Sequence, residues 1–327
     1  MTTSVALCTY NGAQHIRKQV ESIISQTVPV DEIVICDDRS SDNTLHIIEQ
    51  IQQQTHTNIL VYRNETNLGV CANFQKAVNL CTGDIIFLSD QDDVWVPEKV
   101  KTIIDWFYLN PSKNVVFSDA ILIDSDGHTI GNSLFNRVGF SEEYRKYFDA
   151  GCELPVFYCN HATGATMAIR GKIQFAEYCS PSILHDEVIS LLAIQDKALG
   201  YITQPLTQYR IHGEQEKSIP PDEQSAQERF NEVHILDPNI NASRINRWVF
   251  PFNDRTRSYI DFLKKRSHFS SSIFCFVYTL LYKNTYKQQY GSMYRRFIQY
   301  DRKLLYTRVK KVLNRRYPGI YSTKTII

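Results

Sequence analysis

GDIIFLSDQDDVW, residues 83–95, joins a run of apolar side chains to a cluster of acids. Residues 85–88 have the length and composition of a buried strand, and Asp90, Asp92 and Asp93 then place three carboxylates within four positions. Like charges this close destabilise one another unless a cation or hydrogen-bond donors compensate them. We therefore expect a core strand whose carboxyl end carries a functional site.

The same alternation of strand and helix patterns runs along the first hundred residues. Short apolar runs at 4–9, 32–38 and 58–64 precede the run at 83–90, and each interval has the length of a helix. This order predicts βαβ units in one open, mainly parallel sheet of an α/β protein. Beyond it we expect a helix after Pro97, a strand at 115–124, a loop entering a strand at 159–170, a helix at 184–195 and a last strand at 204–215.

Charge is unevenly distributed along the chain. The 327 residues carry a formal net charge of +1, but residues 255–327 hold 17 Lys and Arg against two acids, whereas residues 1–254 hold 19 against 33. We interpret residues 1–215 as the α/β domain, 216–243 as a flexible surface segment rich in Pro, Glu, Gln and Asn, and 244–327 as a basic, aromatic helical region.

The basic region has two interpretations. Its Lys and Arg alternate with Phe and Tyr, a composition typical of peripheral contact with an anionic membrane, and we favour this interpretation. Alternatively, its helices pack on the acidic domain and offset the charge of that domain. No recognition motif for nucleic acid accompanies the charge, so we expect no nucleic-acid partner.

Cysteine usage and the absence of a signal pattern predict the compartment. The eight cysteines form no CxxC pair, and several lie in apolar runs, so we interpret them as buried thiols of a reducing compartment. The N-terminus has no basic patch followed by an apolar core. The apolar run at 273–282 has ten residues, against about 20 needed to span a bilayer. We expect a cytoplasmic protein.

Polar residues close the first, second and fourth predicted strands. Thr9, Tyr10 and Asn11 follow the first, Asp38 follows the second, and the acids at 90–93 follow the fourth. Ligands of open parallel sheets bind at the carboxyl ends of the strands, so these side chains are candidates for one site. Carboxylate oxygens are the ligands that Mg²⁺ or Mn²⁺ prefers, together with water and substrate phosphates.

Six motifs in order carry a family resemblance. CTYNG, ICDDRSSDNT, NLGVCANFQKAV, GDIIFLSDQDD, HDE at a helix start and YRIHG span residues 1–215, and together they resemble the family 2 glycosyltransferases of the GT-A fold. Within that family the chain is similar to bacterial rhamnosyltransferases that extend surface polysaccharides. The resemblance implies a GT-A catalytic domain at 1–215, a UDP- or dTDP-sugar donor and a divalent metal, Mg²⁺ or Mn²⁺.

The resemblance also assigns roles on the donor side. It implies that Asp38 hydrogen-bonds the pyrimidine base, that Asp90 faces the ribose or a metal-bound water, and that Asp92 ligates the metal on the diphosphate. Charge builds on the leaving diphosphate as the sugar–phosphate bond breaks, and a metal there stabilises the transition state more than the ground state. Thr9, Tyr10 and Asn11 would line the nucleotide site.

On the acceptor side, the resemblance places the catalytic base at Asp186, with Glu187 as a second candidate. An inverting transfer needs such a base to take the proton of the acceptor hydroxyl. His212 matches a position that approaches the metal or the diphosphate, and Arg210 could neutralise the same charge. Gly164 would allow close approach of the acceptor loop. The implied acceptor is a glycan, lipid-linked at the inner face of the cell membrane.

Structural roles compete with each of these assignments. Asp90 and Asp92 could form a solvated turn, Asp38 and Asp186 could cap helices, and His212 could be an ordinary loop histidine. A nucleotidyltransferase also uses strand-end carboxylates and a metal, but the basic, Gly-rich stretch typical of that class is missing after the first strand. A noncatalytic nucleotide-sugar-binding or membrane scaffold protein is the third alternative.

Overall fold

The computed structural model describes residues 1–149, 161–179 and 184–212. The chain divides into two compact units, Met1–Asn239 and Ile240–Ile327, and all described residues belong to the first unit. The segment predicted at 216–243 and the basic region predicted at 244–327 lie outside the described residues. Within the described part, no helix is both long and apolar enough to cross a membrane.

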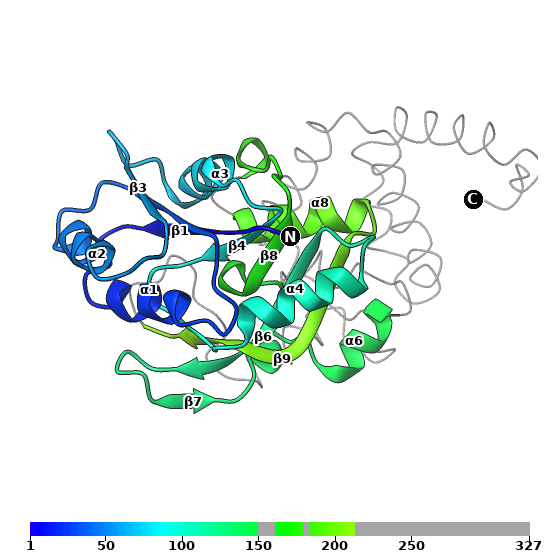
Figure 1. The fold of residues 1–327 in the computed structure, drawn as a ribbon. Helices are drawn as coiled ribbons and strands as arrows, with labels where there is room; N and C mark the ends of the chain where they lie inside the picture. Colours follow the sequence, from blue (N-terminus) through cyan, green and yellow to red (C-terminus); the bar gives the residue numbers. More distant parts are fainter. Residues whose placement is uncertain (150–160, 180–183, 213–327) are drawn as a thin grey trace, which may run out of the picture. The chain divides into compact units, whose positions relative to one another are not determined.

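Four parallel strands form the first half of the sheet, in the order β3-β2-β1-β4 (Figure 1). All four coincide with the apolar runs that predicted them, and their carboxyl ends meet at one edge because they run in the same direction. Their bounds are β1 Thr3–Thr9, β2 Glu32–Asp37, β3 Ile59–Arg63 and β4 Ile85–Ser89.

The second half of the sheet mixes strand directions. β8 pairs antiparallel with both β4 and β6, and β9 runs parallel to β6 with register shifts around Asp119. The short strands β5 and β7 pair antiparallel with β9 and β6. The last strand begins at Leu199, earlier than predicted, because it follows β6 along that strand's whole length. The bounds are β5 Val94–Trp95, β6 Val115–Ile123, β7 Thr129–Gly131, β8 Met167–Arg170 and β9 Leu199–Arg210.

Helices fill the predicted intervals and cover both faces of the sheet. Figure 1 shows α3 and α8 on one side of β1 and β4, with α1 and α4 on the other. Three short elements, α5, η1 and η2, lie in the connections. The bounds are α1 Ile16–Ile24, α2 Thr44–Gln52, α3 Val70–Leu80, α4 Lys99–Leu109, α5 Leu134–Arg137, α6 Glu142–Asp149, η1 Gly164–Thr166, η2 Ala176–Tyr178 and α8 His185–Gln195.

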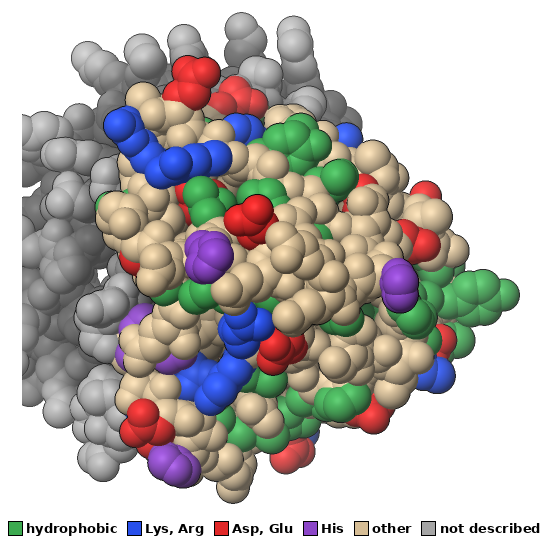
Figure 2. All heavy atoms as spheres, turned by 60° about the vertical axis from the view of Figure 1, so that its left-hand side comes forward, with side chains coloured by type: hydrophobic (Ala, Val, Ile, Leu, Met, Phe, Trp, Pro, Cys, Tyr) green, Lys and Arg blue, Asp and Glu red, His purple; other side chains and the backbone are tan. Residues whose placement is uncertain are grey.

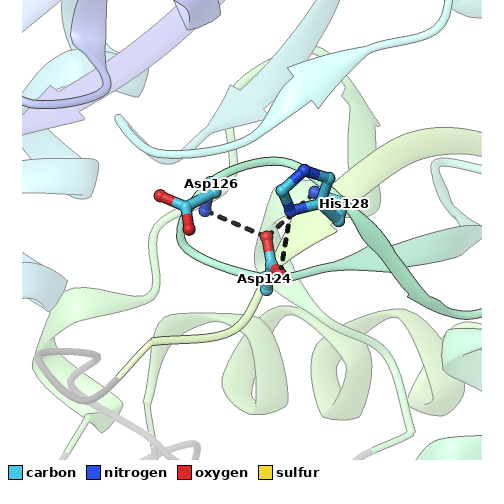
Figure 3. Close-up of side chains that lie close together, drawn as sticks. All are labelled: Asp124, Asp126 and His128. Carbon is cyan, nitrogen blue, oxygen red and sulfur yellow. Dashed lines mark hydrogen bonds and ion pairs between the residues drawn. The ribbon is translucent and has the colours of Figure 1, made fainter.

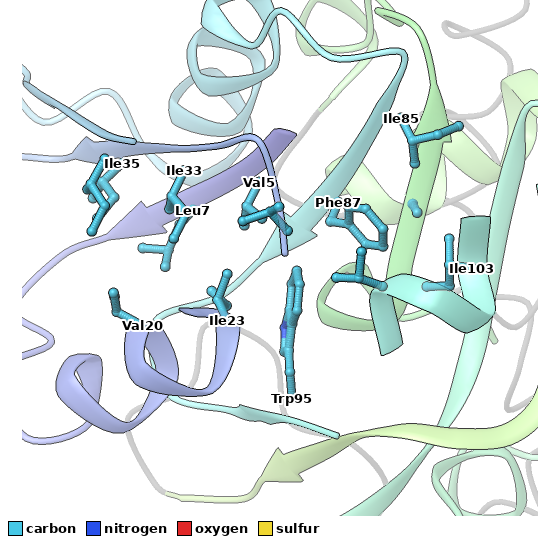
Figure 4. Close-up of a cluster of buried hydrophobic side chains, with 14 of the residues drawn as sticks. Val5, Leu7, Val20, Ile23, Ile33, Ile35, Ile85, Phe87, Trp95 and Ile103 are labelled. Atoms are coloured by element: carbon cyan, nitrogen blue, oxygen red, sulfur yellow. The ribbon is translucent and has the colours of Figure 1, made fainter. Parts of the chain in front are cut away.

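The hydrophobic core explains why the strands are continuous apolar runs in the sequence. Val5 and Leu7 of β1 pack against Val20 and Ile23 of α1 (Figure 4), while the intervening Ala6 is equally buried on the opposite face. A strand covered on both faces needs apolar residues at every position, not at alternate ones. The polar residues that end these strands therefore mark where the core stops.

Candidate active site

Gln91 joins the end of β1 to the acids that follow β4. Its side-chain oxygen Oε1 accepts hydrogen bonds from Oγ1 of Thr9 at 2.6 Å and from the backbone N–H of Tyr10 at 2.9 Å. Its Nε2 donates to the backbone oxygen of Tyr10 at 3.0 Å. The hydroxyl of Thr9, predicted to line the nucleotide site, thus holds Gln91 in place. The sequence analysis did not predict this role of Gln91, although its position between Asp90 and Asp92 could have marked it as part of the site.

The acids Asp90 and Asp93 are held in surroundings that disfavour ionisation. Burial, and then the charge of Asp92, raise the pKa of Asp90 to about 7. Burial, with Asp92 and Asp90, also raises the pKa of Asp93 well above its usual range, although its Oδ1 accepts the backbone N–H of Arg210 at 2.9 Å. Nearby positive charge would favour the ionised forms. Carboxylate oxygens suit a divalent cation by their chemistry, although the ligand atoms of these acids do not converge on one point as they stand.

Asp92 and His212 are brought together across 120 residues of sequence. Oδ2 of Asp92 lies 2.7 Å from Nε2 of His212, and both side chains are partly exposed. A second imidazole, that of His15, lies with its ring centroid 5.7 Å from the His212 ring. His212 is therefore placed beside the predicted metal ligand. His15 was not predicted, and its position before α1 gave no chemical signal.

Arg210 supports the acid cluster from inside the protein. The side chain is 1% exposed, and its Nε donates to the backbone oxygen of Asp92 at 2.7 Å. One terminal nitrogen donates to the backbone oxygens of Asp124 and Ser125 at 2.8 and 3.0 Å. These partners give the guanidinium a positioning role for the loop that carries Asp92. Its direct contact with a diphosphate stays a prediction.

Lys99 is a buried cation that sequence analysis missed. Its Nζ donates to the backbone oxygen of Ala165 and to Oγ1 of Thr207, both at 2.9 Å, and lies 4.2 Å from the centre of the Trp95 ring. Burial lowers the pKa of Lys99 to about 7, against the opposing effect of Asp93 and Asp90. Its spacing of four residues from the buried Ile103 was the available signal, because it puts Lys99 on the apolar face of α4.

Asp38 orders the loop that leads into α3. Its carboxylate accepts hydrogen bonds from Nδ2 of Asn64 at 2.7 Å and from the backbone N–H groups of Leu68 and Gly69 at 2.7 and 2.9 Å. It does not cap α2; Asp42 instead accepts the N–H of Thr44 in that helix. The structure thus connects Asp38 to the 64–69 loop, and its contact with a nucleotide base stays a prediction.

Tyr10 and Asn11 lie at the surface beyond β1. The side chain of Tyr10 is 51% exposed, so the ring is available to stack on a base. Asn11 adopts a left-handed backbone with φ of 50°, and its Oδ1 accepts the N–H of Ser41 at 2.8 Å. Figure 2 turns forward the side toward which β1 runs in Figure 1, and acidic, basic and histidine side chains lie close together on this face.

The helix α8 begins with the predicted base and its alternative. Asp186 is 8% exposed and its Oδ1 accepts the N–H of Glu187 at 2.8 Å, while Glu187 is only 1% exposed. Asp186 is among the charges that raise the pKa of Asp90, which brings it electrostatically into the cluster. A Cβ at Gly164 would lie 2.6 Å from Nε2 of His185, so the absence of a side chain leaves room for this ring. The role of Gly164 in an acceptor loop stays a prediction.

A second group of possible metal ligands lies in the turn between β6 and β7. Asp124, Asp126 and His128 could each offer an atom to one ion (Figure 3). Oδ1 of Asp124 already accepts the N–H groups of Asp126 and His128, both at 2.9 Å. The carboxylate of Asp124 thus stabilises the turn itself, and exposed acids of this kind are common without an ion. The described residues hold no other such group of three.

The sheet, with four parallel strands followed by a half of mixed strand directions, has the GT-A fold that the resemblance implied. Residues 4–165, about half of the chain, match the model of glycosyl transferase family 2. The family match confirms the predicted fold and the resemblance, and favours glycosyl transfer over nucleotidyl transfer.

Individual relatives agree with the family. The dTDP-rhamnosyl transferase RfbG of Shigella flexneri is 35% identical over 154 residues, which cover 45% of this chain and 52% of the relative. The chondroitin synthase of Escherichia coli is 33% identical over 129 residues, covering 39% and 18%. The crystal structure of S. aureus TarS 1-349 in complex with UDP-GlcNAc superposes with a TM-score of 0.51 at 19% identity, covering 84% of this chain and 78% of that one. The chain spans half or less of the length of the first curated relatives it matches.

Proposed function

We propose that this protein is an inverting, metal-dependent glycosyltransferase that moves one sugar from a UDP- or dTDP-sugar to a hydroxyl of a lipid-linked polysaccharide precursor. One observation carries the proposal: at the edge where β1 and β4 end, Oδ2 of Asp92 lies 2.7 Å from Nε2 of His212, and the charges of Asp92 and Asp186 both raise the pKa of Asp90. Similar proteins support the donor class, since RfbG is a dTDP-rhamnosyl transferase and the structurally similar TarS was crystallised with UDP-GlcNAc.

On the donor side, the exposed ring of Tyr10 would stack on the base and Asp92 would face the diphosphate. Asp92, with His212 beside it, would hold the divalent ion, which when bound supplies positive charge to the leaving diphosphate. Gln91 fixes the distance between Tyr10 and Asp92, because its side chain is hydrogen-bonded to the backbone of Tyr10 and it precedes Asp92 in the sequence. The donor would therefore be bound by a rigid edge rather than by independent loops.

On the acceptor side, Asp186 would take the proton of the attacking hydroxyl. The acceptor oxygen forms a bond to the anomeric carbon from the face opposite the diphosphate, the bond from carbon to the diphosphate oxygen breaks, and the hydroxyl proton passes to the carboxylate. Asp186 is favoured over Glu187 because it interacts with Asp90 and is the less buried of the two.

The test separates donor binding from transfer. Nucleotide sugars are first screened with Mn²⁺ by thermal shift to identify the donor. Asp186→Asn should then keep the donor dissociation constant within about twofold while lowering kcat by about 10² to 10⁴, and Glu187→Gln should retain transfer. Equal loss of donor binding and transfer in Asp186→Asn, or an unchanged kcat, would contradict the role of Asp186.

The membrane part of the proposal rests on the charge of residues 255–327. Each basic residue near an anionic surface contributes roughly 1 kcal/mol, so a few contacts would hold the protein there. Deletion of 255–327 should reduce sedimentation with anionic liposomes, and salt should weaken binding of the full chain. Equal sedimentation of the two proteins would refute peripheral attachment through this region.

A further inference from the structure

Two thiols and an imidazole meet where α3, η2 and α8 approach one another. Cys71 lies in the first turn of α3, Cys179 directly follows η2, and His185 is the first residue of α8. Both cysteines are partly exposed, unlike Cys8, Cys36 and Cys81, which are buried, and no disulfide joins any of these five. The proposed transfer uses none of the three residues, so their arrangement needs a separate explanation.

Hydrogen bonds fix Cys179 near the start of α3. Gln75 stands four residues after Cys71, on the same face of the helix. Its Oε1 accepts the N–H groups of Phe175 and Ala176 at 2.6 and 3.1 Å. Cys179 follows within one short helix, and its thiol donates to the backbone oxygen of Phe175 at 3.6 Å. These bonds place Cys179 beside the first turns of α3, where its thiol also influences the Cys71 thiol.

His185 brings an unusual polar group to the same place. Its side chain is 5% exposed and its ring stacks on Phe74 with centroids 4.2 Å apart. Neither ring nitrogen has a hydrogen-bond partner of good geometry. Cys71 lies one helical turn before Phe74, on which the ring stacks, and its thiol is among the groups that influence the ring. The backbone N–H of His185, at the start of α8, also points to that sulfur. A thiolate at Cys71 would therefore meet two helix N-termini and an imidazole.

The charges around the sulfur agree with a thiolate. Contact with Cys179, and then His185, lower the pKa of Cys71 to about 5 against the opposing effect of burial. Burial lowers the pKa of His185, but Cys71, Asp186 and Asp90 together outweigh it and raise the net value. In contrast, burial raises the pKa of Cys81, at the other end of α3, to about 12.

We propose that Cys71 is a peroxide-reactive thiol that forms a disulfide with Cys179, linking α3 to the segment that leads to Asp186. The thiolate of Cys71 attacks one peroxide oxygen, the O–O bond breaks, and Cys71 becomes a sulfenic acid while the second oxygen leaves as hydroxide, which takes up the proton that the Cys71 thiol had released and becomes water. The Cys179 sulfur then attacks the sulfur of Cys71, the S–O bond breaks, and the leaving hydroxide takes the Cys179 proton as a second water. Two thiols are oxidised and one hydrogen peroxide is reduced to two waters.

Peptide mapping of the full chain tests the bond directly. The protein is treated with hydrogen peroxide, blocked with N-ethylmaleimide and digested without reductant. The expected product is a peptide pair joined through Cys71 and Cys179. In Cys179→Ser the reaction should stop at the sulfenic acid, which dimedone captures on Cys71. Absence of the pair, or pairing of Cys71 with Cys152 or Cys159 instead, would overturn the proposal.

The rate of alkylation tests the thiolate separately and needs no transfer activity. Between pH 8 and pH 6 an ordinary thiol slows by about 100-fold with iodoacetamide, because its thiolate fraction falls tenfold per pH unit. Cys71 should slow by less than about threefold, whereas Cys81 in the same sample should not react at either pH. A 100-fold decrease at Cys71 would contradict the proposed reactivity. Neither readout depends on the proposed glycosyl transfer.

Discussion

Replacement of Gln91 by Ala would test how the two halves of the donor site are joined. The variant loses three hydrogen bonds, to Oγ1 of Thr9 and to the N–H and C=O of Tyr10. A hydrogen bond contributes a net ~1 kcal/mol, so we expect the free energy of unfolding to fall by about 3 kcal/mol. Part of this loss arises because the hydroxyl of Thr9, 2% exposed, is left without its acceptor.

Urea denaturation and nucleotide calorimetry would measure the two consequences. Nucleotide affinity in Mn²⁺ should fall by about tenfold or more, because Tyr10 is no longer fixed relative to Asp92. Gly12→Ala should act in the same direction, since a Cβ there collides with Oε1 of Gln91. Gln50→Ala is the control, because Gln50 also makes side-chain hydrogen bonds but lies on α2.

A double-mutant cycle would identify the interaction that matters. Thr9→Val removes one of the three hydrogen bonds and keeps the shape of the side chain. In the Gln91→Ala protein this bond is already lost, so Thr9→Val should cost less stability there, with a coupling free energy of about 1 kcal/mol. Purely additive effects of Thr9→Val and Gln91→Ala, or a Gln91→Ala protein with unchanged stability and nucleotide affinity, would refute the reasoning.

Three further outcomes are expected. Lys99 has a folded pKa of about 7, below its usual 10.5, so the unfolded chain binds more protons between these values and the wild type should gain stability relative to Lys99→Met as the pH rises from 7 to 9; a difference in Tm that does not depend on pH would contradict this. Gly164→Ala should destabilise the protein by about 1–3 kcal/mol in urea denaturation, because the new Cβ would lie 2.6 Å from Nε2 of the buried His185; unchanged stability would show that the ring can move aside. Asp38→Ala should speed amide hydrogen exchange at Leu68 and Gly69, whose N–H groups it holds, and equal protection in both proteins would exclude this role.

The sequence predicted the parallel half of the sheet well because local patterns determine it. Each of the first four strands is a short, mostly apolar run; β1, β2 and β4 are buried at every position, and β3 is partly exposed at the edge of the sheet. The antiparallel insertion of β8 between β4 and β6 depends on long-range pairing, for example of Phe87 with Ala168, and no local pattern encodes such a partner. The order of the second half therefore required the structure.

The residues of the candidate site also divide into those that the sequence could indicate and those that only the structure shows. Asp92 and Asp186 could be proposed from the sequence because acids at a strand end and at a helix start belong to recognisable local motifs, and their roles stay predictions. The tasks of Gln91, Lys99 and Arg210 could not, because each depends on which backbone groups the fold brings within hydrogen-bonding distance. The sequence around Arg210 does not show whether its side chain is buried or exposed. Burial decides whether such an arginine supports the loop from inside or contacts the substrate.

The role of the acids at the end of β4 is best tested by calorimetric titration with UDP and dTDP, with and without Mn²⁺. Two variants would be compared with the wild type: Asp92→Asn at the strand end, and Asp126→Asn in the other group of possible metal ligands. We predict Mn²⁺-dependent nucleotide binding that is lost in Asp92→Asn and retained in Asp126→Asn. Nucleotide binding that needs no metal, or that survives in Asp92→Asn and is lost in Asp126→Asn, would contradict the placement of the donor at this edge.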